Sequence, residues 1–201
     1  LIVGRGTIVD GESRQLIIEF PYSSLEVQGL TRAFDQQTSI RLGLDSIRER
    51  LLDLIDTDIR IVKKDHGVDF VASFQRPSMI WRNILYILKN ATSYPYFRVP
   101  DILYHPDVPP EWKREFVRGY ADVAGNIRQA NRYVDGRHRV RLDVLNYPTN
   151  WEVPVQLCTL LQEQLDVPVQ LITYGHPNLN RGFREHQLNI FASAFLRIGF
   201  S

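Results

Sequence analysis

Residues Phe116 to Ile127 read FVRGYADVAGNI, a pattern typical of a helix that packs closely against a partner and then turns into a strand. Gly119 and Ala121 are small, so the backbone of a second helix can come nearer than large side chains would allow. Gly125 follows the last helical residue, and a glycine at that position ends a helix. The stretch therefore predicts a helix at a helix–helix interface, followed directly by a strand.

A shorter version of the same pattern, LIVGRGTI, occupies Leu1 to Ile8 and ends on Gly6. Each version is followed by the same order of elements: a strand, an amphipathic helix with apolar residues three and four apart, two more strands, and an apolar helix. In the first half these are Arg14 to Phe20, Ile40 to Leu54, Asp58 to Lys63, Asp69 to Phe74, and Met79 to Leu88. In the second half they are Arg137 to Leu145, Val153 to Leu161, Val167 to Tyr174, Gln187 to Phe191, and Ala192 to Ile198.

This repetition predicts an α+β fold of two pseudo-symmetric αββαββα halves, with antiparallel sheets packed against helices. The first half spans residues 1–93 and the second residues 111–201. Between them, residues 94–110 contain five prolines and are expected to be a linker, because proline disfavours regular structure. We expect the first helix to be truncated at Leu1, with its earlier turns upstream.

The two motifs and the repeated element order resemble those of the LAGLIDADG homing endonuclease family, over nearly the whole chain. The resemblance implies that the two motif helices pack side by side and that the two sheets form a saddle over DNA. It also implies that the last acidic residue before each motif glycine acts on the scissile phosphates through a divalent metal.

The chain departs from the family at both of these acid positions, which hold Arg5 and Ala124. Neither side chain offers an oxygen to a metal ion. Asp122 is a weak substitute, because a residue two positions back on a helix points about 200° away. Asp10 is an equally weak one, since it lies beyond the first glycine. We therefore expect no intact catalytic residue, no metal site and no cofactor, with Mg²⁺ required only if nuclease activity survives.

DNA contacts are expected from the strands, because arginine on a strand face suits both phosphates and guanine edges. In the run Arg137 to Leu145, arginines alternate with apolar residues, so one face is polar and the other is apolar. The predicted DNA-binding residues are Arg5, Arg14, Gln15, Lys63, Lys64, Arg128, Gln129, Asn131, Arg132, Arg137, Arg139, Arg141, Asn180, Arg181 and Arg184.

Composition narrows the remaining possibilities. The net charge is only +1, but the segment from Lys113 to Arg141 holds eight basic residues against three acidic ones, as a phosphate-facing surface requires. The single cysteine, Cys158, excludes an internal disulfide and is consistent with an intracellular protein. No apolar stretch approaches the ~20 residues of a membrane span. We expect a monomer with an internal pseudo-dimer.

Three functions fit these observations. The first is sequence-specific binding of double-stranded DNA without cleavage, as a regulator, splicing cofactor or specificity domain. The second is an active metal-dependent endonuclease that uses displaced acids. The third is a protein-association module that binds no nucleic acid.

Overall fold

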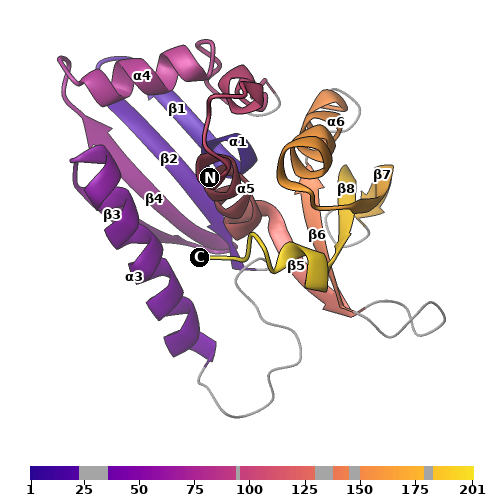
Figure 1. The fold of residues 1–201 in the computed structure, drawn as a ribbon. Coiled ribbons are helices and arrows are strands. Elements are labelled where there is room, and N and C mark those ends of the chain that lie inside the picture. The colour runs from indigo at the N-terminus through magenta and orange to yellow at the C-terminus, as the bar shows by residue number, and fades with distance from the viewer. Residues whose placement is uncertain (23–35, 94–95, 130–137, 145–149, 179–182) are drawn as a thin grey trace.

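The computed structural model describes residues 1–22, 36–93, 96–129, 138–144, 150–178 and 183–201 (Figure 1). In both halves a motif helix runs into a pair of strands, and a helix and a second pair of strands follow. The first half contains α1 (Ile2–Arg5), β1 (Gly6–Asp10), β2 (Arg14–Pro21), α3 (Gln36–Ile55), β3 (Ile59–Lys64), β4 (Gly67–Phe74) and α4 (Met79–Ile87).

The second half repeats this order with a longer motif helix. It contains α5 (Pro110–Ala124), β5 (Gly125–Gln129), β6 (His138–Val144), α6 (Glu152–Thr159), β7 (Val169–Asn178), β8 (Phe183–Phe191) and α7 (Ala192–Phe195). A π turn, Leu160–Gln164, extends α6, and α7 is shorter than the helix expected from Ala192 to Ile198.

Each half builds a four-stranded antiparallel sheet, and the two sheets have the same strand order. The orders are β1-β2-β4-β3 and β5-β6-β8-β7. The motif glycines hold matching places in the ladders, since Gly6 pairs with Ile18 at the start of β1 and Gly125 pairs with Leu142 at the start of β5. The predicted two-repeat α+β architecture is confirmed.

One face of each sheet packs against helices and forms the core. In the first sheet, Leu16, Ile18 and Phe20 of β2 are buried, and their neighbours on β4 in the same rows are buried as well. In the second sheet, Val140, Leu142 and Val144 of β6 occupy the corresponding positions. We call the opposite face of each sheet, which carries the intervening residues, the open face.

The centre of the molecule is α5, which lies between the two sheets in Figure 1. Its last turns are largely buried, and the buried residues there include Val117, Tyr120, Ala121 and Val123. The short helix α1 packs against them through Gly4, because a Cβ atom built on Gly4 would lie 2.7 Å from Cγ2 of Val123. The predicted close contact between the two motif helices is therefore present.

The motif glycines are required by close contact rather than by backbone conformation. Gly6 and Gly125 have φ values of −90° and −100°, which any residue can adopt. A Cβ on Gly6 would lie 2.6 Å from the carbonyl oxygen of Ile2, and one on Gly125 would lie 2.5 Å from that of Ala121. Each strand thus leaves its helix so sharply that a side chain at the junction would overlap the preceding turn.

The proline-rich segment between the halves is partly regular. A 3-10 turn, Asp101–Tyr104, interrupts it, and Phe97, Val99 and Leu103 are buried in the shared core. Tyr104 also donates a hydrogen bond of 2.7 Å to the carbonyl oxygen of Gln156. The segment is therefore packed against the second half along much of its length.

Substituting Gly4 by alanine is expected to destabilise the protein by about 1–3 kcal/mol, because the new methyl group overlaps the buried and rotationally stiff side chain of Val123. The control is Gly43→Ala in α3, where nothing lies within 4 Å of the added Cβ. That change should be neutral or stabilising by up to ~1 kcal/mol. Urea unfolding compares the two, and equal effects would contradict the packing described.

Candidate nucleic-acid interface

The two positions that hold acids in the resembling family lie at the ends of the paired motif helices. Arg5 and Ala124 each follow a residue of the contact between Gly4 and Val123, and each precedes the glycine that begins a strand. Ala124 is buried, with 3% of its surface exposed. Arg5 is half-buried, and its Nε atom makes no hydrogen bond with any described residue.

These residues do not fit a divalent cation. Neither Arg5 nor Ala124 offers an oxygen ligand. The carboxylate of Asp122 is turned toward the chain's last residues, where it accepts a hydrogen bond of 2.9 Å from the backbone N–H of Ser201. Asp10 pairs with Arg14 at 3.5 Å, four residues along β1 and so about 13 Å from Gly6. Within the described part of the chain, no group of three or more His, Cys, Asp or Glu side chains is placed to hold a metal.

The open face of the second sheet gathers arginines and amides. The alternation expected on β6 is present, with Arg139, Arg141 and Asp143 on the open face. Arg128 of β5 lies directly opposite Arg139 and joins the same face. Three of the arginines predicted to bind DNA therefore lie together.

Arg141 and Asp143 form a buried ion pair at the centre of this face. Nε of Arg141 lies 2.7 Å from Oδ1 of Asp143, and Nη2 donates a hydrogen bond of 3.0 Å to Oδ2. Asn126 donates to the same Oδ2 atom at 3.1 Å. Burial raises the pKa of Asp143 to about 6, which the charge of Arg141 opposes and the nearby carboxylate of Glu185 increases.

The open face of the first sheet is different, because it mixes apolar side chains with charges of both signs. Arg60 and Lys64 lie on it together with Glu19 and Asp69. By register, Ile17 and Val71 lie side by side there, with Val9 and Val62 in adjoining rows. Gln15 belongs to this face, opposite Val9.

The predicted basic residues of the first sheet are divided between its two faces. Lys64 is on the open face, where it forms an ion pair with the buried carboxylate of Asp69 that raises the pKa of the lysine. Arg14 and Lys63 follow the register of the helix-covered face, opposite Phe74 and Val68. Successive side chains of a strand point to opposite faces, so Arg14 and Gln15 lie on different faces, as do Lys63 and Lys64.

Several predicted residues lie outside the description. Asn131, Arg132, Arg137, Asn180 and Arg181 are outside the described residues. Gln129 and Arg184 belong to β5 and β8, but their side chains are not described.

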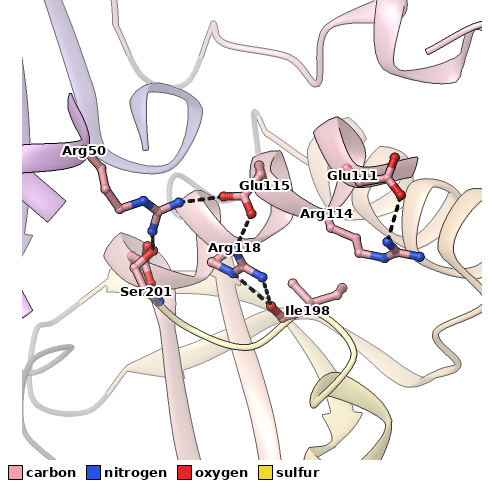
Figure 2. A network of polar contacts seen from close by, with 8 residues as sticks. Arg50, Glu111, Arg114, Glu115, Arg118, Ile198 and Ser201 are labelled. Atoms are coloured by element: carbon pink, nitrogen blue, oxygen red, sulfur yellow. Dashed lines mark hydrogen bonds and ion pairs between the residues drawn. The ribbon is translucent and has the colours of Figure 1, made fainter. Parts of the chain in front are cut away.

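Two basic residues of the motif helix, Lys113 and Arg118, serve packing, so the expectation that the whole segment from Lys113 faces phosphates is corrected. Nζ of the buried Lys113 donates to the side-chain oxygen of Gln164 at 2.8 Å. Arg118 donates two hydrogen bonds, of 2.9 and 2.7 Å, to the carbonyl oxygen of Ile198 and pairs with Glu115 (Figure 2). Glu115 also bonds Arg50 of α3 at 2.7 Å, so this network joins α3, α5 and the last residues.

Sequence reasoning missed the polar residues of β8. Asn189 and Gln187 share the open face with the arginines, because they pair with Arg141 and Asp143 of β6. Glu185 lies two residues before Gln187 on β8 and so belongs to the same face. Their alternation with His186, Leu188 and Ile190 was the available signal.

Comparisons with known proteins agree on the architecture. The structure of the N-terminal LAGLIDADG domain of DUF199/WhiA matches with a TM-score of 0.50 and 13% identity, over 100% of this chain and 77% of that one. Mesophilic variants of the homing endonuclease I-DmoI match at 0.54 and 15%, over 98% of this chain and 90% of theirs. The chain has a LAGLIDADG-like fold.

A further LAGLIDADG structure is that of an I-DmoI variant in complex with its target DNA in the presence of Mn, with a TM-score of 0.51 and 16% identity over 98% of this chain and 86% of that one. No sequence-family profile and no curated protein matches the chain. Among the described helices, none is long and apolar enough to cross a membrane.

Asp143→Asn should change the pH dependence of stability. Folding raises the pKa of Asp143 from 3.8 to about 6, because burial favours the neutral acid. The free energy of unfolding of the wild-type protein therefore falls as the pH rises from about 4 to above 6. Relative to wild type, the variant should therefore gain about 2–3 kcal/mol in its free energy of unfolding between pH 4 and pH 7. Urea unfolding at both pH values measures the change, and a relative stability that stays constant or falls would contradict the burial of this carboxyl.

Proposed function

We propose that this chain binds double-stranded DNA sequence-specifically and does not cleave it, as a regulator, splicing cofactor or specificity domain. The observation that carries the proposal is the open face of the second sheet. There Arg128, Arg139 and Arg141 lie among amide side chains, while the paired helix ends hold Arg5 and Ala124.

The chemistry of this face suits a duplex. Arginine pairs with phosphates and with guanine, and asparagine and glutamine pair with adenine edges. A four-stranded sheet presents these groups at a regular spacing of about 4.8 Å between strands. A protein of similar fold, I-DmoI, has been solved with its target DNA, which agrees with this use of the architecture.

The loss of cleavage follows from the helix ends. Hydrolysis of a phosphodiester by the metal-dependent route needs a Lewis acid and an activated water, which bound cations supply. Arg5 and Ala124 cannot ligate such a cation, whereas a guanidinium at position 5 can pair directly with a phosphate. Arg5 thus supports retention of DNA at a centre that no longer cuts it.

The two halves contribute unequally. The second sheet offers three arginines and several amides, whereas on the open face of the first the cations Arg60 and Lys64 lie among the carboxylates of Glu19 and Asp69. We infer that most contacts to the duplex come from the second half. The exposed side chains of Val9 and Val62 on the first sheet favour the other candidate, association with a protein, and loss of all DNA binding would leave that candidate standing.

Replacing both Arg128 and Arg139 by alanine should weaken DNA binding and reduce its dependence on salt. Each lost phosphate contact lowers the slope of log affinity against log salt by about 0.9, so the double variant should be shallower by about 2. The matched control is Arg41→Ala with Arg82→Ala, which removes the same charge from the exposed helices α3 and α4. Fluorescence anisotropy between 50 and 200 mM KCl measures the slope. Equal effects of the two double variants would contradict the assignment of the face.

Restoring the two carboxylates should restore metal binding. Wild-type protein is expected to leave a bound duplex intact with Mg²⁺ or Mn²⁺ and to show no change in Tm with either ion. The double variant Arg5→Asp with Ala124→Asp should gain Tm on adding Mn²⁺, because the ion binds the folded state alone. Arg5→Asn with Ala124→Asn is the control. Cleavage by wild-type protein would favour the endonuclease with displaced acids instead.

A further inference from the structure

The three cations on the open face of the second sheet lie in different electrostatic surroundings. Each row of side chains on this face takes one residue from each neighbouring strand, and the rows follow one another along β6 from Arg139 to Asp143. The register places Arg139 between Arg128 and Phe191, Arg141 between Asn126 and Asn189, and Asp143 beside Gln187. Positive charge therefore predominates in the first row, and the carboxylate of Asp143 stands in the third.

Arg141 is held rigidly. Its side chain is 11% exposed, and that of Asp143 is 12% exposed. The carboxylate of Asp143 lies against Nε and accepts a hydrogen bond from Nη2. Glu185, 4% exposed, lies 3.7 Å from the same Nη2 atom and accepts a hydrogen bond of 2.9 Å from Gln187. Both carboxylates lie on the Nε and Nη2 side, so contacts among the described residues leave Nη1 uncommitted.

The charge around Arg141 disfavours a phosphate as its partner. Two carboxylates within ion-pair distance of one guanidinium leave that centre with a net charge of −1 when both are ionised. A phosphate would be repelled, whereas a neutral guanine edge, with its O6 and N7 acceptors, can still accept hydrogen bonds from the uncommitted Nη1 group and from Nη2. Because the side chain is already ordered, little rotamer entropy is lost on contact.

Arg128 and Arg139 differ from Arg141 in both respects. Arg128 is exposed, and its Nε donates 2.8 Å to the amide oxygen of Asn126. Arg139 lies over the ring of Phe191, with its guanidinium carbon 5.6 Å from the ring centre. Among the described residues neither forms an ion pair with a carboxylate. Within the described residues, no carboxylate in an ion pair therefore offsets the charge that these two arginines can offer to a phosphate.

We propose that Arg141 reads a guanine in the major groove and that Asp143 and Glu185 position it, while Arg128 and Arg139 make sequence-independent contacts with phosphates. This assignment rests on the DNA binding proposed above. On this surface, Arg141 in the middle row would contact a base edge, and Arg128 and Arg139 in the first row would contact phosphates.

The test begins with wild-type protein and duplexes selected from a random library. One position of the selected site should prefer guanine over other bases by about 5- to 150-fold. Arg141→Lys should remove most of that preference, because the donors of a single ammonium nitrogen cannot span Asp143 and both guanine acceptors as those of the planar guanidinium can. Arg139→Lys is the matched control, with the same change on the same strand and face, and it should keep the preference.

Asp143→Asn separates positioning from a general structural role. Removing a negative charge should leave affinity for non-specific duplex unchanged or higher, while the guanine preference falls at least threefold. Damage to the fold would lower both. A second measurement needs no variant: replacing the guanine by 7-deazaguanine removes the N7 acceptor and should weaken wild-type binding about tenfold, but leave Arg141→Lys unaffected.

The outcomes separate the two proposals. Binding by wild-type protein with no guanine-preferring position, or a preference lost in Arg139→Lys and kept in Arg141→Lys, would overturn the role of Arg141 while DNA binding stands. If Asp143→Asn lowered both the affinity for non-specific duplex and the guanine preference, the positioning role would be overturned. Failure of wild-type protein to bind any duplex would overturn the proposed function, and this assignment with it.

Discussion

The close approach of the two motif helices is the constraint on which the rest of the structure depends. Gly4 lies so near Val123 that a single added carbon atom would overlap it, and Tyr120 and Ala121 are fully buried beside this contact. Because each helix passes directly into the first strand of a sheet, this contact also sets where both sheets begin. A larger residue at position 4 would therefore move the sheets together with the helices.

The sequence predicted the elements that depend on local pattern. The repeated order, the glycine junctions and the alternation of Arg139 and Arg141 with apolar residues all follow from spacing along the chain. The roles of charged residues depended on distant partners and could not be predicted in the same way. Lys113 bonds Gln164 and Arg118 bonds Ile198, so basic residues that suggested a phosphate surface instead hold the core together.

Faces were also harder to predict at strand ends. Arg14 and Gln15 are neighbours in sequence but lie on opposite faces of their sheet, and knowing which face each takes requires the ladder register with β4. The glycine junctions show a related limit. The sequence predicted that glycine is required there, but the physical reason, contact with the carbonyl oxygen four residues earlier, needs the coordinates.

Carboxylates have different places and uses in this fold. At the helix ends, where a metal would need them, the chain carries Arg5 and Ala124, while Asp143 and Glu185 lie on the sheet and hold an arginine.

The most direct test of a DNA-binding open face is photocrosslinking from position 189, with p-benzoylphenylalanine in place of Asn189, to a bound duplex. Crosslinks from position 189 and none from position 49, on the helix-covered side, are predicted. Crosslinks from Glu49 replaced in the same way, with none from position 189, would contradict it.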